Sequence, residues 1–188
     1  MPENRNSHSR LDPRLPLVLD TRELGRRPGS QRKLELTVPA PGELGVGMIG
    51  VPPGATLDLD LRLEAVMEGV LVSGTASAPL VGECGRCLDP IASEIEVDLQ
   101  ELYAYPESEA TEDEASRLEG DYLDLEPALR DAVVLALPLA PLCREDCGGL
   151  CTVCGARRDD VDCGHDVAPA DPRWAQLNDL AVTDEEQE

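Results

Sequence analysis

LDLDLRLEAVMEGVLVSGTASAPL, residues 57–80, is the stretch that decides the fold. Apolar residues occupy every second position from Leu57 to Met67, and charged residues fill most of the positions between them. Alternation with a period of two is typical of a β-strand with one buried and one solvent-facing side. Glu68-Gly69 predicts a tight turn, and the apolar phase resumes from Val70 to Leu80. The stretch therefore predicts two long antiparallel strands.

A third strand is predicted in IASEIEVDLQELYAY, residues 91–105, where Ile91, Ile95, Val97 and Leu99 alternate with acidic or amide side chains. ECGRC, residues 83–87, falls at the turn before it. Three such strands joined by short links indicate an antiparallel meander with one solvent-exposed face. Residues 15–20 and 32–38 are shorter candidate strands, and the Gly and Pro content of residues 42–55 indicates a loop.

A helix is predicted over residues 124–138, with Asp124 as N-cap and Pro127 in its first turn. Its apolar face is formed by Leu125, Leu129, Ala132, Val133 and Ala136, and Pro138 and Pro141 end it. A second, short helix is expected at residues 171–180. The predicted fold class is α+β: an antiparallel β-meander or partial barrel with one main helix and a C-terminal zinc knuckle.

The expected domain organisation is a flexible basic arm at 1–14, a single domain at 15–180 and an acidic tail at 181–188. Within the domain we expect an acidic loop at 105–121 and a cysteine-rich knuckle at 143–165. Residues 1–33 hold eight basic and four acidic residues, a net charge of +4. Because the whole chain has a net charge of −22, the remaining residues carry −26.

So acidic a chain, with a pI near 4.2, is repelled by phosphate backbones and anionic lipid. We therefore expect neither DNA nor a membrane as partner. No hydrophobic run approaches the length of a membrane span, and the polar N-terminus lacks the apolar stretch of a secretory signal. The expected location is the cytoplasm.

The seven cysteines occur at ligand spacing: Cys84-x2-Cys87, Cys143-x3-Cys147, Cys151-x2-Cys154 and Cys163-x-His165. Two thiolates two or three residues apart on a turn can bind one tetrahedral ion. Buried thiols and thiol redox chemistry are the alternatives. They are less favoured because the cysteines lie in Gly-, Arg- and Asp-rich segments without a thioredoxin-like context. We interpret the pattern as structural zinc, one or two ions per chain.

Pairing in chain order gives two sets of four: Cys84, Cys87, Cys143 and Cys147, then Cys151, Cys154, Cys163 and His165. A single site made from both C-x-x-C pairs is the alternative. In either case protein fills all four positions and leaves none for water or substrate, which favours structural over catalytic metal. The sequence also contains no Walker-type loop and no nucleophile elbow, and we expect no enzymatic activity.

In combination, several short motifs resemble the YceD family, the large ribosomal RNA subunit accumulation proteins. They are C-x-R-C-L (Cys84–Leu88), D-L-x-P (Asp124–Pro127), L-P-x-x-P-L-C (Leu137–Cys143), Cys147, G-L-C-x-x-C-G (Gly149–Gly155) and D-P-R (Asp171–Arg173). Some relatives lack the downstream C-x-x-C knuckle, which favours the chain-order pairing. Relatives usually carry an N-L-N-like stretch where this chain has Ala156-Arg157-Arg158-Asp159-Asp160.

The resemblance implies a role in synthesis, processing or stability of the large-subunit (23S) rRNA. We expect a non-enzymatic ribosome biogenesis factor whose acidic body binds a ribosomal protein or a pre-50S particle. Contact with rRNA or with the partner would come from the basic arm and from Arg86, Arg144, Arg157 and Arg158, or these four arginines only balance charge near the thiolates. The alternatives are an rRNA-directed enzyme, such as a nuclease cofactor, and a zinc-ribbon regulator.

Overall fold

A computed structural model describes residues 11–42, 44–108 and 115–165 of the 188-residue chain. The chain divides into two compact units, Met1–Asp146 and Cys147–Glu188, each described by itself. The predicted helix at 171–180, the acidic tail and most of the basic arm lie outside the described residues.

The first unit contains nine strands and one helix among its described residues. The strands are β1 (Val18–Asp20), β2 (Gln31–Pro39), β3 (Leu44–Val46), β4 (Ile49–Val51), β5 (Thr56–Ala65), β6 (Gly69–Glu83), β7 (Pro90–Ala104), β8 (Ser116–Arg117) and β9 (Tyr122–Asp124). The helix is α1 (Glu126–Ala136). This composition confirms the α+β class.

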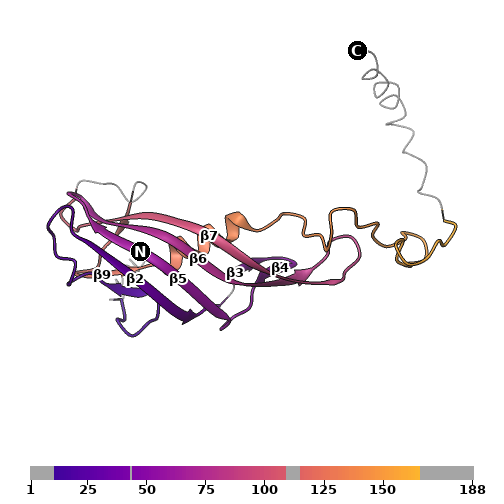
Figure 1. The fold of residues 1–188 in the computed structure, drawn as a ribbon, viewed down its shortest axis with the longest axis horizontal. Coiled ribbons are helices and arrows are strands. Elements are labelled where there is room, and N and C mark those ends of the chain that lie inside the picture. The colour runs from indigo at the N-terminus through magenta and orange to yellow at the C-terminus, as the bar shows by residue number, and fades with distance from the viewer. Residues whose placement is uncertain (1–10, 43, 109–114, 166–188) are drawn as a thin grey trace, which may run out of the picture. The chain divides into compact units, whose positions relative to one another are not determined.

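The predicted meander is present as β5, β6 and β7 (Figure 1). β6 pairs with β5 from Asp58↔Ser77 to Ala65↔Val70 and with β7 along its entire length. On β5 the alternating residues from Leu57 to Ala65 are buried, whereas Met67 lies in the turn and is 86% exposed. The period-two pattern therefore predicted the buried face correctly up to the turn.

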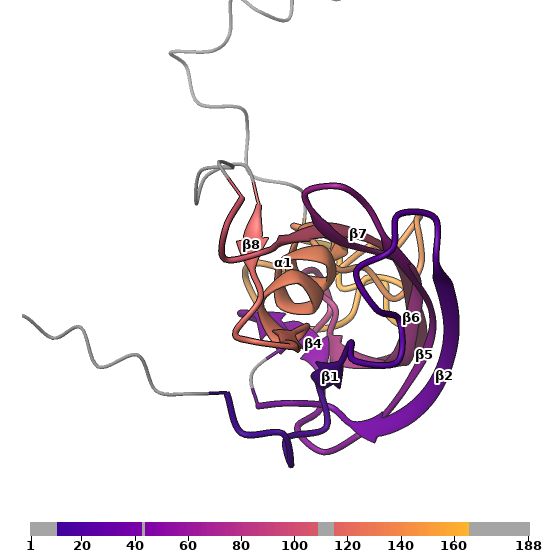
Figure 2. The same ribbon diagram turned by 90° about the vertical axis from the view of Figure 1, so that its left-hand side faces the viewer.

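The inner face of the sheet packs against α1 (Figure 2), and the helix contacts β7 and β3. Leu129 and Val133 of the helix are buried in the same core as Leu61 and Leu63 of β5. At the C-terminal end of β7, the Tyr103 hydroxyl donates to the Asp124 carbonyl oxygen at 3.0 Å. This bond ties the chain that enters the helix to the sheet.

The sheet is open. Its strand order is β2-β5-β6-β4-β3, with β7 on the other side of β6 and the short β8 beyond it. Among the described residues no pairing joins β2 to β8 or β3, so the sheet curves around α1 without closing into a barrel (Figure 2). β1 and β9 form a separate two-stranded sheet at the helix start, where Leu125 N–H donates to Leu17 O.

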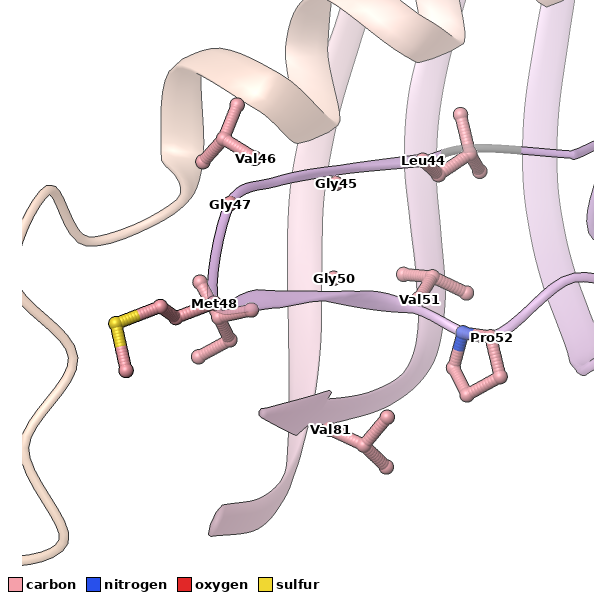
Figure 3. Close-up of a pocket in the computed structure, with 10 residues that line it drawn as sticks. Leu44, Gly45, Val46, Gly47, Met48, Gly50, Val51, Pro52 and Val81 are labelled. Carbon is pink, nitrogen blue, oxygen red and sulfur yellow. The ribbon is translucent and has the colours of Figure 1, made fainter. Parts of the chain in front are cut away.

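The prediction of a loop at residues 42–55 was wrong. The segment forms the hairpin β3–β4, which turns at Gly47 with φ +53°. The hairpin extends the sheet beside the C-terminal end of β6 (Figure 3). Gly45 and Gly50 approach so closely that a Cβ on either would lie under 3 Å from the other's Cα. The glycines that suggested a loop are thus required by close strand contact.

Three other expectations need correction. Part of the acidic segment 105–121 is structured: β8 pairs in parallel with β7, and Ala115 and Leu118 beside it are buried. The N-cap of α1 is Leu125, not Asp124, and no side chain caps it. The Asp124 carboxylate lies one residue before the N-cap and accepts the N–H of Glu126, the first helical residue, at 3.0 Å. Ala136, expected on the buried face, is exposed, and Leu137 is buried in the core.

No helix in the described part of the chain is long and apolar enough to cross a membrane.

The position of Gly74 in the middle of β6 gives a test of the sheet. A Cβ at this residue would lie 2.0 Å from the Asp60 carbonyl oxygen on β5, a contact with backbone that cannot move aside. We expect Gly74→Ala to lower the free energy of unfolding by about 1–3 kcal/mol in urea denaturation. Ser73→Ala, the neighbouring control, should change it by less than about 0.5 kcal/mol; equal effects of the two would contradict the register.

Candidate metal centres

The first candidate centre begins at the turn between β6 and β7. Cys84 N–H donates to Asp89 O at 2.8 Å, and Leu88 N–H donates to Cys84 O at 2.9 Å, which closes the turn around Cys84–Cys87. Leu88 has φ +63°, and no other described non-glycine residue has a positive φ. Both cysteines of this turn are buried.

The segment that follows α1 brings the next ligand to this turn. Gly85 N–H donates to Pro141 O at 2.8 Å, and two residues later the Cys143 sulfur lies 3.5 Å from the Cys87 sulfur. The ligand atoms of Cys84, Cys87, Cys143 and Cys147 all lie within 4.8 Å of one another.

The second candidate centre lies in the second unit. The ligand atoms of Cys151, Cys154, Cys163 and His165 also lie within 4.8 Å of one another, with Cys151 Sγ 3.7 Å from His165 Nδ1. Gly155 N–H donates to Cys151 O at 2.8 Å, and Cys151 N–H donates to Ala156 O at 2.7 Å. The loop of Ala156–Asp160, where the sequence departs from the N-L-N-like stretch, thus folds back on the knuckle.

The two C-x-x-C turns have the same local geometry. In each, the residue after the second cysteine donates its N–H to the carbonyl of the first and has a positive φ, +63° at Leu88 and +73° at Gly155. The left-handed region costs a glycine almost nothing but costs a leucine about 1–2 kcal/mol. The second turn has glycine, which this geometry favours, at position 155, whereas the first turn has the strained Leu88 at the equivalent position.

Backbone N–H groups in both turns stabilise a thiolate. Burial raises the pKa of Cys84, but N–H groups of Cys143, Cys87 and Arg86 outweigh it and lower the pKa to about 6. N–H groups of Cys154 and Val153 likewise lower the pKa of Cys151 to about 6, against the effect of burial. The deprotonated form, which binds metal, is therefore favoured at neutral pH.

The pKa of Cys163 moves the other way. The His165 N–H lowers the pKa, but the Cys151 and Cys154 sulfurs and burial together raise it. The three sulfurs repel one another when they are deprotonated, and a cation among them would relieve that repulsion.

The donor sets fit a tetrahedral zinc ion. Ligands about 2.3 Å from zinc are roughly 3.8 Å apart along the edges of the tetrahedron. The 3.5 Å and 3.7 Å separations are close to that value, and all seven cysteines are free of disulfides. The two C-x-x-C pairs belong to different sets, so the structure has the chain-order grouping and not the single mixed site.

The four arginines expected near the cysteines are on the surface or partly buried. Arg144 pairs with Asp146 at 3.2 Å and Arg157 with Asp160 at 3.3 Å, while Arg86 is exposed and Arg158 half-buried. Two of the four are thus balanced by a neighbouring carboxylate. Their contact with RNA or a partner remains a prediction.

The outer face of the sheet is a second candidate surface, whose acidic character the sequence predicted but whose arrangement across the strands it did not. The register places Asp58 and Asp60 of β5 opposite Ser77 and Thr75 of β6, and these opposite Glu96 and Asp98 of β7. Glu35 of β2 extends the Asp60 row. The alternation of acidic residues on each strand was visible in the sequence, but the pairing of β2 with β5 was not.

The family model described as Large ribosomal RNA subunit accumulation protein YceD matches residues 72–181, which include all eight candidate ligands. The chain belongs to the YceD family. A protein of Mycobacterium bovis and one of Mycobacterium tuberculosis, both named only as uncharacterized, are 48% identical to it over 169 residues. That alignment covers 88% of this chain and 81% of each relative. An uncharacterized protein of Mycobacterium leprae is 43% identical over 173 residues, 90% of this chain and 79% of the relative. No solved structure gives a significant match.

The grouping of ligands predicts how metal is lost from variants of this YceD-family chain. We expect elemental analysis to find two zinc ions per chain, and about one in each of Cys84→Ser and Cys151→Ser, because each removes a ligand from a different set. Thr152→Ala, inside the second turn but not a ligand, should keep both ions. Metal-free protein, purified under reducing conditions without chelator, or loss of both ions from each serine variant, would rule out two separate centres.

The strained Leu88 gives a second test. We expect Leu88→Gly to raise the free energy of unfolding of the metal-loaded protein by about 0.5–1 kcal/mol, because glycine relieves the positive φ. Leu88→Ala keeps a Cβ and should give no gain. If thermal denaturation shows both variants destabilised alike, the two turns are not equivalent.

Proposed function

We propose that this protein is a non-enzymatic assembly factor of the cytoplasm that supports large-subunit rRNA accumulation by binding a basic ribosomal protein on the outer face of its sheet. The family description supplies the rRNA connection. The acidic outer face is the observation that carries the choice of partner.

The acidic side chains form two ranks on this face. Asp58 and Asp60 lie on β5, and Glu94, Glu96 and Asp98 lie on β7, all exposed. The strand between them, β6, presents only the small Ser77 and Thr75 at these positions. Since neighbouring strands are about 4.8 Å apart, the two ranks are roughly 10 Å apart. The small side chains of β6 leave a shallow furrow between them.

A shallow hollow of about 470 Å³, lined by Glu35, Leu36, Thr37, Asp58, Leu59, Asp60, Thr75 and Ser77, lies over β2, β5 and β6, beside this furrow. Lysine or arginine side chains of an extended segment would find carboxylates on both sides of it. Such complementarity raises association rates and selects basic partners over acidic ones. A phosphate backbone would be repelled from the same face.

The candidate metal centres support a shape-holding role over a catalytic one. Each set offers four protein ligands, and no coordination position remains for water or substrate. His165, the histidine among the described residues, belongs to one of these sets. The hollow beside the β3–β4 hairpin, about 520 Å³, is lined by apolar residues and glycines without a titratable side chain (Figure 3). These features do not favour an rRNA-directed enzyme, and the acidic face disfavours a DNA-binding zinc ribbon.

The test is binding of the full chain to RNA-free proteins extracted from large ribosomal subunits. We expect capture of a basic ribosomal protein, and an affinity reduced about tenfold or more by Asp60→Lys/Asp98→Lys, because opposed charges would then become like charges. Glu68→Lys, in the exposed turn between β5 and β6, introduces lysine away from the furrow and should bind as the parent does.

The contrary result is binding that occurs only when rRNA is present and survives the Asp60→Lys/Asp98→Lys change. Loss of that binding in Arg86→Ala/Arg158→Ala would then assign contact to the arginines around the cysteine loops.

A further inference from the structure

β2 has one free edge in the described part of the chain, since it pairs with β5 alone. Ala40 N–H donates to Ala55 O and Ala65 N–H donates to Ser30 O, so the even-numbered residues direct their backbone groups at β5. In an antiparallel strand these directions alternate. The odd-numbered residues Gln31, Lys33, Glu35 and Thr37 therefore direct their N–H and C=O groups away from the sheet.

The charges beside this edge are unfavourably arranged within one chain. On the outer face Lys33 lies opposite Arg62, and Glu35 lies opposite Asp60. Like charges directly opposite each other on neighbouring strands are destabilising. Lys33 and Glu35, both exposed, are the outermost members of these pairs, and each lacks an opposite charge in the row across the sheet.

We propose that β2 is a self-association surface on which a second copy of this chain binds, with the two β2 strands antiparallel about a two-fold axis at Leu34. In this register Lys33 faces Glu35 of the second copy, and Glu35 faces its Lys33. Gln31 faces Thr37 in the same way. The sheets of the two copies become continuous, and each like-charge pair acquires an opposite charge beside it.

Charge and backbone chemistry select this register over its neighbours. Centring the axis on Lys33 or on Glu35 would place two like charges directly opposite each other. Centring it on Leu36 would place Lys33 opposite Pro39, which has no N–H to donate. Only the Leu34 register combines opposite charges with complete backbone pairs from Gln31 to Thr37.

The apolar side of the strand is compatible with a second copy. Leu34, Leu36 and Val38 are half-buried, packed on the core but left partly open along the edge. The two-fold axis brings Leu34 against its counterpart, which would cover apolar surface on both copies. Backbone pairing with alternate side chains is the usual form of strand addition at a free edge.

Neither of the other long or terminal strands offers such an edge. The exposed charges of β7 near its free edge are acidic, at Glu94, Glu96 and Asp98, so two copies would repel each other there. β3, at the end of the sheet, is three residues long. β2, with nine residues and both signs of charge, is the strand suited to self-pairing.

The test is sedimentation velocity of the full chain over a wide concentration range. We expect a concentration-dependent rise from the monomer mass of 20.2 kDa toward twice that value. Lys33→Glu and Glu35→Lys should each weaken the dimer about tenfold or more, because both place two like-charge pairs in the interface. Both should fold at least as stably as the parent, since each replaces a like-charge pair within the chain by an opposite one.

A mixture of the Lys33→Glu and Glu35→Lys variants tests the proposed pairing of Lys33 with Glu35 directly. Each facing pair of the mixed dimer joins an acidic side chain of the Lys33→Glu chain to a basic side chain of the Glu35→Lys chain. The mixture should therefore associate although neither variant does alone. The double variant Lys33→Glu/Glu35→Lys should dimerise as the parent does, and Glu94→Lys, the matched charge change on β7, should leave the dimer unchanged.

A parent that stays monomeric, single variants that dimerise normally, or a mixture that stays monomeric would each overturn the proposal. The inference is independent of the proposed function.

Discussion

The ladder between β6 and β7 pairs fifteen residues of each strand, from Gly69↔Ala104 to Glu83↔Pro90. At about 3.4 Å per residue, it holds its two ends roughly 50 Å apart. At one end Tyr103 binds the chain just before α1, and at the other the cysteine turn receives the chain just after it. The helix segment is therefore fixed to the hairpin at both ends, and its apolar face is held against the sheet.

This constraint explains why ligands so distant in sequence come together. Cys87 and Cys143 are 56 positions apart, yet their sulfurs are 3.5 Å apart because the intervening helix returns along the hairpin. A metal ion at this place would close a long loop, and cross-links that close long loops restrict the unfolded chain most. Metal at the first centre would thus connect ligands that are far apart in the sequence, whereas metal at the second would join ligands only 14 positions apart.

The sequence predicted the long elements well, because each carries many residues in one period. The alternation from Leu57 to Leu99 defined the meander, and the pattern around Leu129 and Val133 defined the helix. The ligand groups were also predictable, since cysteines at metal-binding spacing have few alternative explanations. Their function as metal ligands remains a prediction.

The features that sequence reasoning missed depend on contacts between distant residues. β3, β4 and β8 have two or three residues each, too few to show a period, and they form only because β6 and β7 offer edges to pair with. The same holds for the outer acidic ranks and for the like-charge pairs of β2, which arise from register. The positive φ at Leu88 has no sequence signal because glycine, the residue that usually marks it, is absent.

We infer that the two separate sets of four protein ligands each hold a metal ion in closed coordination. Zinc K-edge X-ray absorption on the purified protein tests it most directly. We expect a first coordination shell averaging about 3.5 sulfurs and 0.5 imidazole nitrogen per zinc, with Zn–S distances near 2.3 Å and no metal neighbour. A first shell containing water oxygen, or a second zinc within about 4 Å, would contradict it by indicating an open or binuclear site.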